Sequence, residues 1–172
     1  MATETSLGEL SIALDRDVFL RTLIRELAGV LEEVVGYDEA AGYISLVGQN
    51  IGEWINSEYK KELGAALLSR SQVAEVLVDL KARIEGDFSI TEQSDEMIVL
   101  ENGRCPFGDK VLGRRSMCMM TSNVFGLIAS ENLGYAKVTI DKSIAAGDDR
   151  CRVTVHLNPS AGAEGREYVR SG

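Results

Sequence analysis

The sequence predicts a single α+β domain in which an antiparallel sheet packs against helices. Three segments in the first half have apolar residues at helical spacing and carry capping signals. After them the apolar period changes to two in two separate stretches, with one more helical segment in between. The 172 residues fit one domain better than two, so we expect residues 1–157 to form it. Residues 158–172, rich in Gly and polar residues, are expected to be a flexible tail.

The first predicted helix begins after Asp15 or Asp17, either of which can cap it, and ends at Gly36. Its apolar positions recur at helical spacing, while charged residues occupy the remaining positions. These positions are Val18, Leu20, Leu23, Ile24, Leu27, Leu31, Val34 and Val35.

A second helix follows, with Asp38 as its predicted cap and its end near Gly64. It contains Gly48 and Gly52, four residues apart, and each costs about 1 kcal/mol relative to Ala inside a helix. Close approach of another helix is the favoured reason for this pair, with close approach of a ligand as the alternative. The apolar stripe consists of Tyr43, Ile44, Val47, Ile51, Trp54, Ile55 and Tyr59.

The second half of the chain supplies the predicted sheet. Ser69 and Gln72 form a capping box for a third helix that ends at Gly86. Alternation from Phe88, a turn at 94–96 and a strand over 97–100 predict a hairpin. A fourth helix from Ser116 to Gly134, a strand over 136–140 and a last strand over 151–157 complete the domain.

Charge and composition exclude several classes of protein. Lys and Arg number 18 against 27 Asp and Glu, for a net charge of −9, and such a surface repels nucleic-acid phosphates. No apolar run approaches the roughly 18–20 residues of a membrane span. The N-terminal sequence MATETSLGEL carries acids where a signal peptide carries Lys or Arg, so we expect a cytoplasmic protein.

Common catalytic and metal-binding motifs are missing. The sequence contains no phosphate-binding glycine loop and no paired-His zinc helix. The single histidine, His156, lies on the opposite face of the predicted last strand from Cys151. A Cys–His catalytic pair is therefore geometrically poor, and we interpret His156 as an exposed strand residue.

The three cysteines are the informative residues. Cys105 stands in a loop before Pro106, Cys118 falls in the first turn of the fourth helix, and Cys151 opens the last strand. A helix start favours a thiolate, and these three places can meet at one end of a sheet. Three thiolates gathered there would suit zinc or an iron–sulfur cluster. The alternative is that the cysteines are small core residues.

Four segments in the C-terminal third resemble the methanogen output domain family, which is related to the four-vinyl-reductase small-molecule-binding domains. They are CPFG at 105–108, CMMTSNVFG at 118–126, NLGYAKV at 132–138 and AGDDRCRV at 146–153. The resemblance covers residues 105–155, and the turn Gly147-Asp148-x-x-Cys151 is its most specific element.

This resemblance implies an α+β ligand-binding fold like that of the four-vinyl-reductase domains and the heme-based nitric oxide sensors, dimeric through N-terminal helices. The wider superfamily includes sensor domains of aromatic-responsive regulators and vesicle-tethering subunits. Output-family members commonly accompany histidine kinases or other signalling proteins. Zinc-binding relatives carry an acid and a cysteine ahead of the Gly-Asp-x-x-Cys turn. Here Ser143 stands eight residues before Cys151, so the second cysteine would be Cys105 or Cys118.

We therefore expect a sensory module that reads redox state, a gas or a small ligand through a metal or iron–sulfur cluster bound by Cys105, Cys118 and Cys151. One alternative is a metal-free sensor whose hydrophobic ligand contacts Met117, Met120, Val124 and Phe125. The other is a cysteine-dependent or reductase-like enzyme of the same fold. The first two helices offer more apolar surface than one small sheet needs, so we also expect a homodimer through them.

Overall fold

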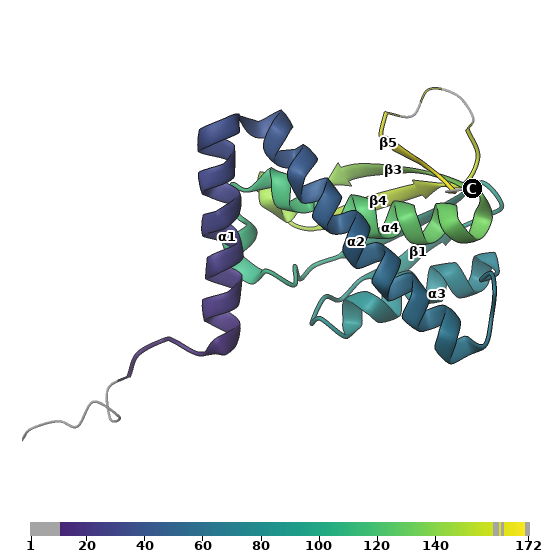
Figure 1. Cartoon of the computed structure of the whole chain (residues 1–172), viewed down its shortest axis with the longest axis horizontal. Helices are drawn as coiled ribbons and strands as arrows, with labels where there is room; N and C mark the ends of the chain where they lie inside the picture. The colour runs from purple at the N-terminus through teal and green to yellow at the C-terminus, as the bar shows by residue number, and fades with distance from the viewer. Residues whose placement is uncertain (1–10, 160–161, 163, 171–172) are drawn as a thin grey trace, which may run out of the picture.

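The computed structural model describes residues 11–159, 162 and 164–170, and these form an α+β domain (Figure 1). Its α-helices are α1 (Arg16–Val35), α2 (Tyr37–Leu63), α3 (Arg70–Ala82) and α4 (Cys118–Leu133). The strands are β1 (Ser89–Gln93), β2 (Met97–Asn102), β3 (Tyr135–Lys142), β4 (Cys151–His156) and β5 (Arg166–Val169). Short 3-10 helices are η2 (Gly108–Val111), η3 (Arg115–Met117) and η4 (Ile144–Ala146).

Helix boundaries follow the capping signals of the sequence. Asp15 accepts a hydrogen bond from the Val18 N–H and caps α1, and the capping box of Ser69 with Gln72 begins α3. Gly64 ends α2 in the left-handed conformation, which glycine adopts without steric cost. Asp38 lies in the first turn of α2 rather than at its cap.

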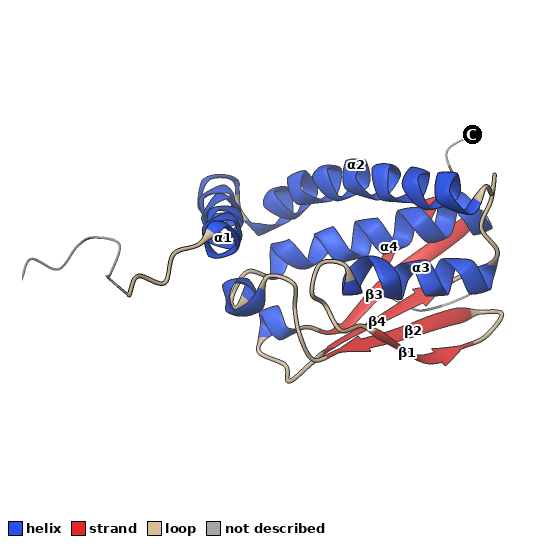
Figure 2. Cartoon of the chain, turned by 90° about the horizontal axis from the view of Figure 1, so that it is seen from below, coloured by secondary structure: helices blue, strands red, loops and turns tan. Residues whose placement is uncertain are grey.

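Helix α4 lies between α2 and the sheet, and with α3 it covers one face of the sheet (Figure 2). The glycine pair of α2 permits this layer to form. A Cβ on Gly48 would lie 2.9 Å from the Asn123 Cβ, and one on Gly52 would lie 3.3 Å from the Val124 Cα. The helix-packing interpretation of Gly48 and Gly52 is therefore confirmed.

The sheet is antiparallel with strand order β1-β2-β4-β3-β5. Its core face is built by register-matched apolar residues such as Ile98, Val155 and Val138, all buried. Residues 166–169, which we expected in a flexible tail, form the edge strand β5 beside β3 instead. Tyr168 of this strand is anchored by a hydrogen bond between its hydroxyl and that of Ser122, which explains why the segment is held.

Helix α1 stands at one end of the domain, away from the sheet (Figure 1). It packs on α2, η2 and η3, but many of its large apolar side chains stay exposed. The exposed set on α1 is Phe19, Leu20, Leu23, Ile24, Leu27, Val30 and Val34. No helix of the described part is long and apolar enough to cross a membrane.

A cysteine-lined cavity beside the first helix

The three cysteines line one cavity of about 70 Å³. Cys105 reaches it from the loop after β2, Cys118 from the first residue of α4, and Cys151 from the first residue of β4. The Cys151 sulfur accepts a hydrogen bond of 3.4 Å from the Ile144 N–H. The expectation that a loop, a helix start and a strand start meet at one end of the sheet is therefore confirmed.

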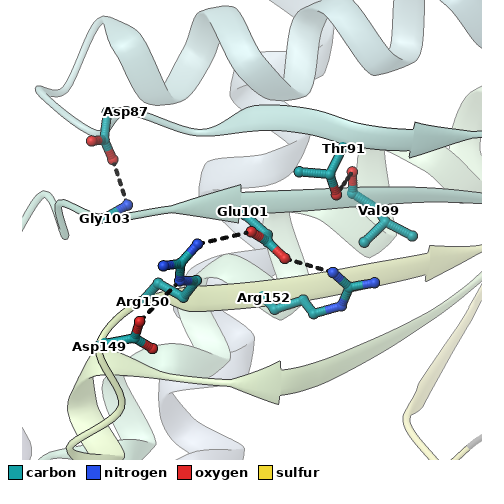
Figure 3. Close-up of polar contacts among 8 residues, drawn as sticks. All are labelled: Asp87, Thr91, Val99, Glu101, Gly103, Asp149, Arg150 and Arg152. Atoms are coloured by element: carbon teal, nitrogen blue, oxygen red, sulfur yellow. Dashed lines mark hydrogen bonds and ion pairs between the residues drawn. The ribbon is translucent and has the colours of Figure 1, made fainter.

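Polar contacts fix the chain segments that carry Cys105 and Cys151 (Figure 3). The Asp87 carboxylate accepts hydrogen bonds from the N–H groups of Gly103, at 3.0 Å, and Arg104, at 2.8 Å. Across the neighbouring strand pair, Arg152 donates to Glu101 at 2.5 Å. These contacts hold the start of the Cys105 loop and the beginning of β4 in place.

Lys81, in the last turn of α3, is the residue that sequence reasoning missed. It lines the same cavity and is only 5% exposed. Its ammonium donates to the Thr121 hydroxyl at 2.8 Å and lies 5.5 and 5.3 Å from the ring centres of Phe88 and Phe125. Burial lowers the pKa of Lys81 to about 8, although the three cysteine side chains oppose this shift.

A signal for Lys81 was present in the sequence. Val73 and Leu77 lie eight and four residues before it on the buried face of α3, and residues four apart share a helix face. A lysine that continues such an apolar row is placed in the core by its helix rather than in solvent.

The thiols are protonated rather than ionised. Burial raises the pKa of Cys118 to about 11, and a hydrogen bond to Ser143 opposes this only in part. Burial also raises the pKa values of Cys105 and Cys151. Cys118 does begin a helix, but the thiolate that we expected there is not favoured because desolvation outweighs the effect of the helix start.

The site residues expected from the sequence divide into two groups. Met117 and Met120 line the cavity with the cysteines, whereas Val124 and Phe125 lie in the main core beneath it. Within residues 11–159, 162 and 164–170, no group of three His, Cys, Asp or Glu side chains is arranged to hold a metal ion. His156 is half-buried at the far end of β4 from Cys151.

Residues 105–117 form one wall of the cavity. The same segment is the surface on which α1 packs. Arg25 donates to the carbonyl oxygens of Lys110, at 2.6 Å, and Leu112, at 2.7 Å. Glu32 of the same helix accepts a hydrogen bond from Ser116 and pairs with Arg114 at 3.6 Å. A small apolar cluster that includes Ala28, Val111 and Met117 lies between the two segments.

Comparison with known proteins gives a family and a fold. The family model described as methanogen output domain 1 matches residues 23–156, whereas no curated protein sequence matches the chain. The fold is similar to that of trafficking protein particle complex subunit 3 from Naegleria fowleri, solved covalently bound to palmitic acid. That pair has a TM-score of 0.57 and 15% identity, over 89% of this chain and 99% of the other.

The fold is also similar to the phenol-responsive sensory domain of the transcription activator PoxR, solved with phenol. The TM-score is 0.61 and the identity 16%, over 88% of this chain and 79% of that one. Both neighbours support the α+β fold that the sequence resemblance implied.

Proposed function

Because this chain belongs to the methanogen output domain 1 family, we propose that it is the sensory module of a signalling protein. In this proposal a small molecule binds in the cavity lined by Cys105, Cys118, Cys151 and Lys81, and its presence is reported through α1. The observation that carries the proposal is the meeting of three thiols and one buried ammonium in a single cavity.

The fold neighbours support a ligand-binding role. One was solved with phenol and the other covalently bound to palmitic acid, so proteins of this fold can bind small and large organic molecules. The cavity here, of about 70 Å³, has room for only a few water molecules and is smaller than typical organic-ligand pockets of roughly 300–1,000 Å³. Its ligand is therefore a molecule of few atoms, or one that opens the cavity as it binds.

The route from cavity to α1 is short. Residues 105–117 contact the cavity on one side and α1 on the other, through the Arg25 and Glu32 contacts described above. A ligand that shifts this segment changes the contacts that hold α1. The exposed apolar face of α1 then provides the surface for a second copy of the chain, and the dimer presents the signal to a histidine kinase or another signalling partner.

The second candidate is a sensor in which the three thiols bind a soft metal or an iron–sulfur cluster. The shared cavity favours it, because thiolates are preferred ligands of zinc and of iron–sulfur clusters. The thiols would have to lose their protons and move closer together, since the described residues do not form a metal site as they stand. Metal analysis of anaerobically purified protein, with Cys105→Ser, Cys118→Ser and Cys151→Ser as controls, distinguishes the two candidates.

A covalent occupant tests the proposed function without knowledge of the natural ligand. Methyl methanethiosulfonate transfers a methylthio group to a thiolate and releases methanesulfinate, so a cavity cysteine becomes a mixed disulfide. We expect hydrogen exchange over α1 to change when a cavity cysteine is labelled. The change should be smaller in Arg25→Gln, which loses the link to Lys110 and Leu112. Unchanged exchange over α1 at full labelling would show that the cavity does not communicate with this helix.

A further inference from the structure

Two polar groups in the cavity wall lack the partners that burial demands. Lys81 has three N–H donors, of which Thr121 accepts one. Asn102 is 4% exposed and lines the same cavity, and its Oδ1 is buried without a hydrogen-bond partner. Its amide nitrogen donates to the Arg104 carbonyl at 3.2 Å, which fixes the orientation of the amide. The cavity thus presents an ammonium donor and an amide acceptor.

Among the residues that the structure describes, no carboxylate supplies a negative charge for Lys81. No Asp or Glu of the described chain forms an ion pair with its ammonium. The cysteines do not replace a carboxylate, because burial keeps their thiols protonated. A buried charge without a partner is costly, and a neutral water molecule cannot cancel it. An anion in the cavity can.

We propose that the cavity binds a small monoanion that retains one hydrogen-bond donor, a class that includes bicarbonate and hydrosulfide. The anionic atom accepts from Lys81 Nζ, and the remaining O–H or S–H donates to Asn102 Oδ1. Such ions have few atoms and suit a cavity of about 70 Å³. This inference rests on the proposed function, because it names the ligand class of the same site.

Matched pairs of ions test both contacts. Nitrate has the shape and charge of bicarbonate but no donor, and chloride is related to hydrosulfide in the same way. Stability of the full chain is measured by thermal unfolding at pH 7.4, in sealed anoxic samples of constant ionic strength, over a concentration series of each sodium salt. The variants are Lys81→Met and, as a matched control, Lys61→Met, which removes an exposed lysine.

We expect bicarbonate or hydrosulfide to stabilise the wild type and Lys61→Met with an apparent affinity about three- to tenfold above that of its matched ion, the factor typical of one hydrogen bond to a neutral acceptor. Lys81→Met should lose that advantage while remaining folded. Asn102→Leu should bind bicarbonate and nitrate equally, because the acceptor is gone. The difference in apparent affinity between bicarbonate and hydrosulfide identifies whether the cavity prefers an oxygen or a sulfur anion.

The proposal is overturned if neither ion exceeds its matched control, or if Lys81→Met responds as the wild type does. Alkylation of the cysteines by iodoacetamide, followed by mass spectrometry, separates this failure from failure of the proposed function. If a neutral compound protects the three cysteines where both anions do not, the anion inference is wrong and the sensory cavity stands. If the labelled protein also shows no change over α1, the proposed function fails as well.

Discussion

Replacing Lys81 with Met should stabilise the ligand-free protein, although it removes a hydrogen bond. Burial lowers the pKa of Lys81 from 10.5 to about 8, and this difference corresponds to about 3 kcal/mol of unfavourable free energy for the charged form. The variant loses the Thr121 hydrogen bond, worth about 1 kcal/mol, and the contacts with two aromatic rings, worth about 1 kcal/mol. Methionine fills nearly the same volume, so the net gain at pH 7 is about 1 kcal/mol.

Urea denaturation of both proteins between pH 7 and pH 10 measures the effect and its origin. The pKa of Lys81 is lower in the folded state than in the unfolded chain, so the unfolded chain binds more protons between about pH 8 and pH 10.5. The free energy of unfolding of the wild type therefore rises with pH through this window. The advantage of Lys81→Met is complete below pH 8 and should shrink above it. The cysteines contribute the opposite trend. Because Lys81 lowers their folded-state pKa values, its loss makes this trend steeper in Lys81→Met, which shrinks the advantage of the variant in the same direction.

Two results would refute this reasoning. The first is a Lys81→Met protein that is less stable than the wild type at pH 7 by 1 kcal/mol or more. The second is a stability difference that does not change between pH 7 and pH 10. Either result would mean that the folded protein already neutralises the Lys81 charge. If the prediction holds, Lys81 costs stability at the place where a ligand is proposed to bind, as is usual for functional sites.

Three further predictions concern packing, assembly and reactivity. Gly48→Ala should destabilise the protein by about 1–2 kcal/mol in urea denaturation, because the added Cβ contacts Asn123. Gly42→Ala should stabilise it by about 0.5–1 kcal/mol, because the Cβ added there contacts no other atom. The chain should form a homodimer through the exposed face of α1 in sedimentation experiments at micromolar concentration. The double substitution Leu27→Glu and Val30→Glu should dissociate this dimer. A monomeric wild type would contradict the prediction. Burial raises the pKa of Cys118 to about 11. Its alkylation should therefore be slower than that of a free thiol at pH 8, and the rate should increase up to about pH 11. An alkylation rate equal to that of an unfolded control would contradict the burial of Cys118.

Much of the fold could be predicted because its signals are local. The caps at Asp15, Ser69 and Gly64 determine helix ends within a few residues of the chain, and alternation around Val138 and Val153 marks strands that face one core. Strand β5 was missed because its four residues form an edge strand. Its position depends on Tyr168 contacting Ser122, which is distant in the sequence.

The candidate site was predictable only in part. The meeting of the cysteines follows from where their elements begin, but the ionisation of Cys118 depends on desolvation by distant segments, which a helix position alone does not reveal. Lys81 was missed because a lysine in a helix is normally exposed. Of the two helices expected to form the dimer surface, α2 uses its face at Gly48 and Gly52 to pack on α4 within the same chain, so this face is not available to a partner.

Native mass spectrometry of the chain after anoxic incubation with the small-molecule extract of its source cells tests the central claim most directly. The account predicts a bound mass on the wild type that is absent from Lys81→Met, together with protection of Cys105, Cys118 and Cys151 from alkylation. A bound metal that any one of the three cysteine substitutions removes would instead establish the metal-binding candidate. The bare polypeptide mass with unprotected cysteines, or a bound mass unaffected by changes in the cavity, would contradict the claim that this cavity is the ligand site.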